Sequence, residues 1–231
     1  LTIGLSDFEA QLQYLNKHYT DQVKFAIAGR NKKKLLNLIS KYDLSIDEDD
    51  ILIANGYHYN ELCTLVNQTK VIASTAGPFA KYGNLLVKAC CSYGTSYVDI
   101  TGETDWIRSM IDQYNDLALL TGAQIINSCG FDSIPWDLSS FFLSKKLKEV
   151  YPNDSLVAIE CYDYVRGHFS GGTLATIQHS IATKDSSNTS ELGFDPLLKD
   201  PTQRGAIKCS GHGLFKKANV LYLQYNQRIK S

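Results

Sequence analysis

Four glycine-containing loops carry the residue types from which a ligand crevice could be built. Each loop follows a short apolar segment that is predicted to be a strand, and glycine lets the backbone turn sharply or approach a ligand closely. In an open sheet of parallel strands, ligands bind beyond the carboxyl ends of the strands. We therefore expect the four loops to border one crevice. The loops are Gly29-Arg30-Asn31, Thr75-Ala76-Gly77-Pro78-Phe79, Thr101-Gly102-Glu103 and Cys129-Gly130-Phe131-Asp132.

Arg30 is the most informative of these residues, because it follows the strand predicted over residues 23–28. At the end of that strand, folds that bind NAD often place Asp or Glu against the ribose 2′-hydroxyl, whereas a cation accommodates the 2′-phosphate of NADP. A guanidinium–phosphate bond contributes about 1.5–3 kcal/mol, which predicts about tenfold to a hundredfold preference for NADP. The alternative is that Arg30 is solvated and that Lys32, Lys33 and Lys34 form a wet helix face.

One expected part of a dinucleotide site is absent from the start of the chain. Residues 1–30 contain no G-x-G-x-x-G loop, which would hold a pyrophosphate at a helix N-terminus. No strand precedes the helix predicted over residues 6–18, which Ser6 and Glu9 would open as a capping box. We expect the sheet to lack its first strand, or that strand to lie upstream of Leu1. The absence of an initiator methionine favours a piece of a longer protein.

Strands and helices alternate along residues 1–149, which predicts a doubly wound, Rossmann-like α/β domain with a parallel sheet. The strands are short, apolar and bounded by Gly or Pro, as is typical of strands buried on both faces. Strands are predicted over residues 23–28, 51–54, 71–74, 97–100 and 124–127, and helices over 6–18, 32–41, 58–68, 84–93, 104–121 and 136–149.

The pattern changes near residue 150, and we predict a partial second domain over residues 150–231 that serves substrate binding or dimerisation. Its first segment alternates in the way of an antiparallel strand from a different sheet. The elements expected there are a strand over 155–165, a helix over 173–183, a surface loop over 184–205 and a strand over 220–225.

Composition narrows the function classes. A formal net charge of −1 argues against non-specific electrostatic binding of nucleic acid. The six cysteines form no C-x-x-C pair, which favours buried thiols in an intracellular, reducing compartment. The five histidines share no metal-ligand spacing, so no metal site is expected. No apolar run reaches the roughly 18 residues that a membrane span requires.

The motifs, taken in order, resemble the saccharopine dehydrogenase-like oxidoreductases, whose relatives include the trans-acting enoyl reductases. The resemblance runs from Phe25 to Leu138. The motifs together are specific for this family, although no single motif would be specific by itself. The motifs are Ala28-Gly29-Arg30-Asn31, Thr75 to Phe79, Tyr82-Gly83, Ala89-Cys90, Tyr97 to Glu103 and Cys129 to Pro135, with a weaker match at Gly171-Gly172-Thr173.

The resemblance implies roles for individual residues. Family members begin with a strand and a Gly-rich loop, which here would fall before Leu1. The 2′-phosphate of the adenosine would contact Arg30 and Asn31. The ribose and nicotinamide side would lie along Thr75, Ala76, Gly77 and Pro78. The crevice toward the substrate would be lined by Gly102, Gly130, Phe131 and Asp132.

No catalytic residue is fixed by the resemblance, and Asp132, Tyr82 and Glu103 are positional candidates for a proton donor. Structural roles are the alternatives. Glu103 would cap the helix that begins near residue 104, because acidic residues favour first turns. Asp99 would orient the turn that follows it, while Phe79 and Trp106 would be packing residues.

The function that the resemblance implies is an oxidoreductase using NADPH on a lipid-like substrate or on a carbonyl or imine compound. Hydride transfer mainly requires that nicotinamide and substrate be held face to face. The alternative is a catalytically silent NADP-binding protein, peripheral to a membrane or lipid droplet, since no acid–base pair is evident. A short-chain dehydrogenase is disfavoured because no Tyr is followed by Lys four residues later.

Overall fold

A computed structural model describes residues 5–154, 158–162, 174, 207–217 and 220–229. The described residues fall into two compact units: the first contains the residues up to Cys129 together with Leu174, and the second contains the other described residues from Gly130 onward. The predicted α/β class is confirmed, since helices alternate with parallel strands in the first unit. The prediction of a functional domain boundary near residue 150 stays a prediction.

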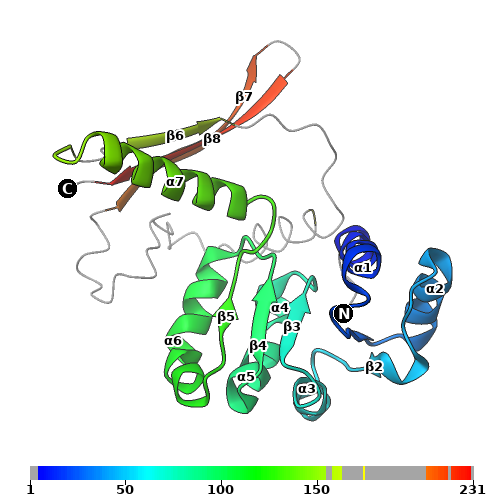
Figure 1. The fold of residues 1–231 in the computed structure, drawn as a ribbon. Helices are drawn as coiled ribbons and strands as arrows, with labels where there is room; N and C mark the ends of the chain where they lie inside the picture. Colours follow the sequence, from blue (N-terminus) through cyan, green and yellow to red (C-terminus); the bar gives the residue numbers. More distant parts are fainter. Residues whose placement is uncertain (1–4, 155–157, 163–173, 175–206, 218–219, 230–231) are drawn as a thin grey trace. The chain divides into compact units, whose positions relative to one another are not determined.

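The first unit contains most of the predicted elements (Figure 1). These are α1 (Leu5–Tyr19), β1 (Ile27–Gly29), α2 (Lys32–Tyr42), the 3-10 turn η1 (Glu48–Asp50), β2 (Ile51–Ile53), α3 (Tyr59–Val66), β3 (Val71–Ser74), α4 (Phe79–Tyr82), α5 (Asn84–Tyr93), β4 (Ser96–Asp99), α6 (Thr104–Thr121) and β5 (Ile125–Ile126). The short α4 and η1 were not predicted. The strand predicted from residue 23 begins only at Ile27.

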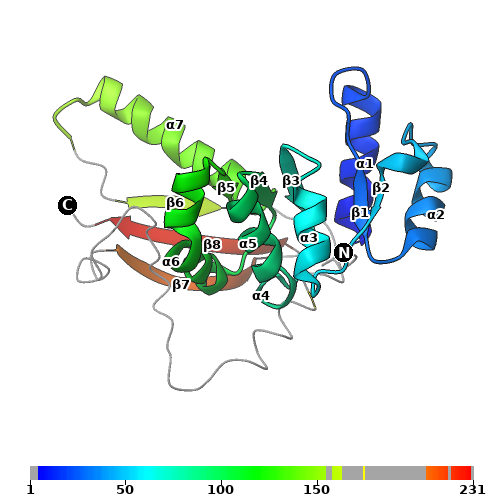
Figure 2. The same ribbon diagram turned by 90° about the horizontal axis from the view of Figure 1, so that it is seen from below.

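The strands of this unit pair in parallel, as predicted, but they form two sheets rather than one. The first sheet pairs β1 with β2, and the second has the order β3-β4-β5. Among the described residues, no pairing joins β1 to β3. In Figure 2, α3, α5 and α6 lie in a row along one face of the second sheet.

The prediction that these strands are buried on both faces is wrong for the second sheet. Val71 on β3 is 52% exposed and Ile126 on β5 is 50% exposed. The reason is that the row of α3, α5 and α6 covers a single face of this sheet (Figure 2). The apolar side chains on the other face are therefore open to solvent among the described residues.

The first sheet is held by packing between α1, α2 and the two strands. Its core is a cluster of buried aliphatic side chains, namely Leu12, Ile27, Leu35, Leu44 and Ile51. The predicted capping box on α1 is wrong, because the helix already begins at Leu5. The Glu9 carboxylate instead accepts a hydrogen bond from Lys41 Nζ at 3.1 Å and another from the Tyr42 hydroxyl. These two bonds join α1 to α2.

The second sheet packs on α5, whose buried residues include two neighbouring cysteines. Cys90 and Cys91 have no exposed surface, and burial raises the pKa of Cys90 to about 12 and that of Cys91 to about 11. Both thiols are therefore protonated and unreactive at neutral pH. The prediction of buried thiols is confirmed for these two residues.

The second unit contains α7 (Ile134–Val150) and an antiparallel sheet of β6 (Ala158–Tyr162), β8 (Val220–Ile229) and β7 (Ile207–Lys217), in the order β6-β8-β7. The antiparallel character was predicted. The strand β7 was not, because its glycines and lysines hide the apolar alternation, and its register shifts between Ser210 and Gly213. The helix predicted over 173–183 and the loop over 184–205 lie outside the described residues, apart from Leu174.

Gly83 joins α4 to α5 at a point where no side chain fits. A methyl group on Gly83 would lie 2.5 Å from Cζ2 of Trp106 and 2.8 Å from the carbonyl oxygen of Phe79. We expect Gly83→Ala to reduce the free energy of unfolding by about 1–3 kcal/mol, because the indole or the backbone must shift.

Gly102→Ala is the matched control, since nothing lies within 4 Å of a methyl group there. Urea denaturation of both variants tests the prediction. Equal stability of the two variants would show that Trp106 does not require glycine at residue 83.

Candidate functional site

The loop after β3 is buried against the fold along its whole length. Thr75 is 7% exposed, Ala76 is 5% exposed, and Gly77 and Pro78 are buried as well. The Ala76 N–H donates to Ser74 Oγ at 3.4 Å, and the Gly77 N–H donates to the Thr75 carbonyl at 3.2 Å. The loop is therefore a fixed turn at the carboxyl end of β3.

Glu103 fastens this turn to the loop after β4. Its carboxylate accepts the backbone N–H of Phe79 at 2.7 Å and that of Ala80 at 2.9 Å. These are N–H groups in the first turn of α4, which have no partner within their own helix. The predicted role in capping α6 is wrong, since Glu103 makes no side-chain bond to that helix.

Phe79 and Trp106 form the apolar support beneath the same turn. Their ring centroids lie 5.6 Å apart, and each residue is 5% exposed. The indole Nε1 of Trp106 donates to Asn84 Oδ1 at 2.6 Å, at the start of α5. The packing interpretation of both aromatic residues is confirmed, because neither ring presents an open face for stacking.

Asp99 fastens the loops after β4 and β5 to each other. The side chain is 2% exposed. Its carboxylate accepts the Thr101 N–H at 3.1 Å, the Ser128 N–H at 3.0 Å and Asn127 Nδ2 at 2.8 Å. Ser128 Oγ donates to the Thr101 carbonyl at 2.8 Å and adds a further link between the two loops. The predicted orienting role of Asp99 is confirmed.

Burial dominates the protonation of this cluster. It raises the pKa of Asp99, although the hydrogen bonds from Thr101, Asn127 and Ser128 act in the opposite direction. Tyr97, two residues earlier on the same strand face, is fully buried, and burial together with the charge of Asp99 raises the pKa of its hydroxyl. In the described part of the chain that hydroxyl has no well-formed hydrogen bond.

A second group of residues gathers around Arg30, which is exposed at the end of β1. Tyr57 follows β2 and Tyr82 ends α4, and their rings contact edge-on at 5.4 Å and 64°. Lys81 Nζ lies 5.2 Å from the centroid of the Tyr82 ring. Burial acts to raise the pKa of Tyr82, but the Tyr57 hydroxyl, Lys81 and Arg30 outweigh it and lower that pKa.

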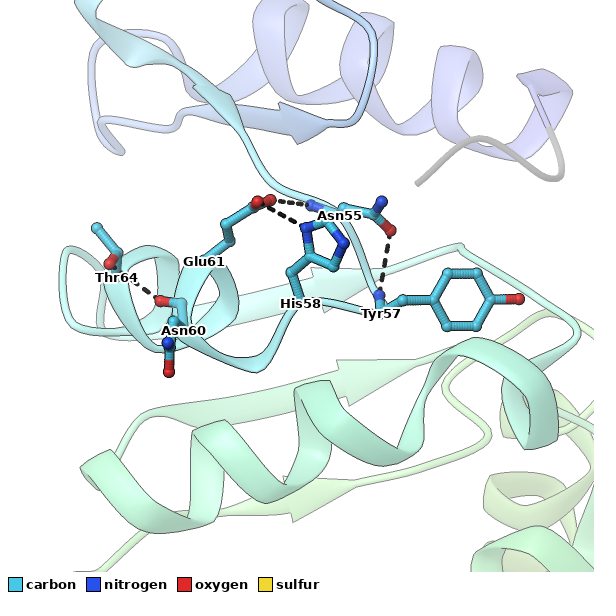
Figure 3. Close-up of polar contacts among 6 residues, drawn as sticks. All are labelled: Asn55, Tyr57, His58, Asn60, Glu61 and Thr64. Atoms are coloured by element: carbon cyan, nitrogen blue, oxygen red, sulfur yellow. Dashed lines mark hydrogen bonds and ion pairs between the residues drawn. The ribbon is translucent and has the colours of Figure 1, made fainter.

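A polar network holds the loop that carries Tyr57 (Figure 3). The Glu61 carboxylate accepts the Asn55 N–H at 2.8 Å and the Nδ1–H of His58 at 2.8 Å. The bond from His58, followed by that from Asn55, lowers the pKa of Glu61. Asn55 Oδ1 accepts the Tyr57 N–H at 3.1 Å. Figure 3 shows the Tyr57 ring projecting away from this network.

Asn31 and Gly102 occupy different kinds of position. Asn31 is the N-cap of α2, where its Oδ1 accepts the Lys34 N–H at 3.0 Å. Gly102 is exposed and has open space where a side chain would be. Lys32 pairs with Glu48 at 2.7 Å, as expected for a lysine on a solvated helix face. The predicted ligand contacts of Asn31 and Gly102 stay predictions.

The remaining predicted residues belong to the second unit. The Gly130 carbonyl accepts the N–H groups of Ser133 and Ile134 at 3.1 and 3.0 Å, which starts α7. Phe131 is 79% exposed, and Asp132 is exposed as well. Their place in a shared crevice therefore stays a prediction. Tyr57 and Lys81 were not predicted, although Tyr57 follows a predicted strand as Arg30 does.

Comparison with known proteins gives relatives by sequence. A Mycobacterium tuberculosis protein named as a trans-acting enoyl reductase is 35% identical over 88% of this chain and 49% of its own length. A trans-acting enoyl reductase of Mycobacterium bovis is 33% identical over 82% of this chain and 46% of its own length. The predicted resemblance to the trans-acting enoyl reductases is confirmed. The chain spans about half the length of the curated relatives it matches.

A third relative is the lipid droplet localized protein of Caenorhabditis elegans, 30% identical over 85% of this chain and 47% of its own length. Within the described residues, no helix combines the length and apolar character needed to cross a bilayer. No protein-family model matches the chain.

Among solved structures, the apo saccharopine dehydrogenase (L-Glu forming) of Saccharomyces cerevisiae is 12% identical, with a TM-score of 0.49 over 69% of this chain and 32% of that one.

The two hydrogen bonds that the Glu103 carboxylate accepts from Phe79 and Ala80 lead to a prediction about stability. We expect Glu103→Ala to reduce the free energy of unfolding by about 1–3 kcal/mol, because two backbone N–H groups lose their acceptor. Glu103→Gln keeps one acceptor oxygen and should lose roughly half as much. Denaturant titration measures both values. An alanine variant as stable as the wild type would show that these two hydrogen bonds contribute nothing to the free energy of unfolding.

The buried carboxyl of Asp99 makes a prediction about pH. Its pKa is raised above the ordinary value of 3.8, so the folded chain binds this proton more tightly than the unfolded chain. The stabilisation from Asp99 is therefore full below that value and is lost as the pH rises through the folded-state pKa. Asn at this position cannot titrate, and its amide oxygen can still accept the two N–H groups.

We therefore expect Asp99→Asn to gain stability relative to the wild type as the pH is raised. Urea denaturation of both proteins from about pH 3.5 to pH 7 gives the difference directly. Using the difference removes the contributions of other carboxyl groups, such as Glu9 and Glu61, whose lowered pKa values act in the opposite sense. A variant that instead loses relative stability with rising pH would refute the raised pKa.

Proposed function

We propose that this chain, which is related to the trans-acting enoyl reductases over most of its length, is the nucleotide-binding part of an oxidoreductase that uses NADPH. The observation that carries the proposal is the exposed Arg30 at the carboxyl end of β1. Folds that bind NAD often have an acidic residue at this position. Among the described residues Arg30 makes no ion pair, so its guanidinium is available to a phosphate.

The residues present fit a dinucleotide in the adenosine part of the site. Arg30 offers the planar fork of donors that a 2′-phosphate accepts. The turn from Thr75 to Pro78 would border the ribose and nicotinamide, and the open space at Gly102 would admit the ligand close to the backbone. The carboxylates of Asp99 and Glu103 would act on the ligand only indirectly, by fixing these loops.

The bound NADPH would supply a hydride to an electron-poor carbon of a lipid-like substrate, in a conjugated double bond, a carbonyl or an imine. The remaining proton must reach the neighbouring atom. Of the candidate donors, Glu103 is engaged by two backbone N–H groups, and Tyr82 lies against Tyr57 beside the charge of Arg30. Asp132, which is exposed, is the remaining positional candidate.

A catalytically silent NADP-binding protein at a lipid surface is the second candidate function. The relative named as a lipid droplet localized protein supports it. So does α7, which exposes Leu138, Phe141 and Phe142. Tight binding of NADPH without its oxidation in the presence of lipid enoyl, carbonyl and imine compounds would favour this candidate over the first.

The proposal predicts a preference between the two cofactors. We expect the full-length protein to bind NADPH more tightly than NADH. Arg30→Ala should reduce the affinity for NADPH by about tenfold to a hundredfold, with little effect on the affinity for NADH. Titration of cofactor fluorescence measures all four affinities. The full-length protein is used because residues 1–30 contain no Gly-rich pyrophosphate loop.

The matched control is Lys32→Ala, which removes a neighbouring cation that already pairs with Glu48. This variant should bind NADPH as the wild type does. Equal affinities of the wild type for NADPH and NADH would remove the role assigned to Arg30.

A further inference from the structure

Two residues that no motif indicated lie beside Arg30 at the same edge of the strands. Tyr57 belongs to the loop after β2, and Lys81 belongs to α4 after β3. The ring of Tyr82 connects them, because it contacts the Tyr57 ring at 5.4 Å and lies 5.2 Å from Lys81 Nζ. Three separate loops therefore bring two cations and two aromatic rings together.

The exposure of Tyr57 is not a consequence of a loose loop. Its side chain is 51% exposed, yet the backbone before and after it is fixed by the bonds of Asn55 and His58 to Glu61 (Figure 3). The Tyr57 N–H itself donates to Asn55 Oδ1. A half-exposed tyrosine on a fixed loop is suited to ligand binding, because its ring combines a large apolar body with a polar end.

Arg30 lies beside the loop that carries Tyr57, because the Ala54 N–H at the start of that loop donates to the Gly29 carbonyl at 3.2 Å. The charges of Lys81 and Arg30 both act on the hydroxyls of Tyr57 and Tyr82. Among the described residues, neither Lys81 nor Arg30 forms an ion pair with a carboxylate. A doubly charged phosphate would satisfy both cations, and the rings provide the apolar contact that a purine requires.

We propose that Lys81 is the second cation for the adenosine 2′-phosphate and that the Tyr57 ring packs against the adenine. This inference rests on the proposed function, because it takes NADPH as the ligand. It assigns Lys81 to discrimination between NADPH and NADH, and Tyr57 to binding of either cofactor. It also places Tyr82 at the adenosine end of the ligand, away from hydride transfer.

The chain contains a matched control for this pair. Lys88 Nζ lies 4.9 Å from the centroid of the Tyr59 ring, so it repeats the contact between Lys81 and Tyr82. Lys88 lies in the middle of α5, and Tyr59 lines a groove of about 440 Å³ with Cys63 and Tyr93. This second pair is formed by α3 and α5 and includes no residue of the loop after β1 that carries Arg30.

The test measures binding of NADPH and of NADH to the full-length protein by fluorescence and calorimetry. We expect Lys81→Ala to reduce the affinity for NADPH by about tenfold and to leave the affinity for NADH unchanged, because one charge-assisted contact is lost. Lys81→Arg should retain most of the affinity. Tyr57→Leu should reduce the affinity for both cofactors about equally, by about fivefold to tenfold, whereas Tyr57→Phe should leave both affinities unchanged. Lys88→Ala should change neither affinity.

Two outcomes would overturn the inference while leaving the proposed function intact. One is an unchanged NADPH affinity in Lys81→Ala, and the other is an equal loss for NADPH and NADH in that variant. Melting temperatures of all variants show whether any loss of binding comes from unfolding, since Lys81 and Tyr57 are both exposed and their loss should not unfold the chain.

Adenosine 2′,5′-bisphosphate separates the inference from the proposed function, because it carries the adenine and the 2′-phosphate without the nicotinamide. If this probe binds in a manner that depends on Lys81 while NADPH does not bind, the phosphate site stands and the oxidoreductase proposal fails. If inorganic phosphate competes as well as the bisphosphate, Tyr57 has no role in adenine binding. A wild type that binds neither the bisphosphate nor NADPH would overturn both proposals.

Discussion

The buried carboxylate of Asp99 is the interaction on which the arrangement of the loops depends. Three donors from two loops surround this side chain, which is 2% exposed, and they offset part of the cost of burying it, although burial still raises its pKa. Asp99 thereby joins the loop after β4 to the loop after β5. Glu103 then joins the loop after β4 to the turn after β3. Two carboxylates thus tie together the ends of three neighbouring parallel strands.

This use of the carboxylates limits the chemistry that the site can perform by itself. A carboxylate that accepts two or three hydrogen bonds within the fold is held in its acceptor role, and its oxygens are directed at the backbone rather than at a substrate. The groups left exposed beside these loops include Arg30, Lys81 and Tyr57. Such a set suits the binding of a phosphorylated ligand that brings its own reactivity, which is the division of labour found in cofactor enzymes.

Sequence patterns predicted the order of elements well, because short apolar runs bounded by Gly or Pro mark strands regardless of their partners. They also placed Arg30 at a strand end. They misjudged Glu103, because local rules assign a first-turn acid to its own helix, whereas it bonds Phe79, 24 residues earlier in the chain. Tyr57 and Lys81 escaped notice for the same reason. Their significance depends on the contact of Tyr57 with Tyr82, which lies in a separate segment, and no spacing along the chain encodes that contact.

The division into two sheets bears directly on where a ligand would bind. In chain order the first sheet runs from β1 to β2 and the second from β3 to β5, so β1 and β3 each have an edge that is unpaired among the described residues. A doubly wound sheet reverses its order at one point, and ligands bind at the strand ends beside that point. Arg30 follows β1, Lys81 lies in the helix after β3, and these are the two strands with the unpaired edges. The carboxyl ends of parallel strands, where ligands bind in such sheets, are therefore also where this chain places two exposed cations.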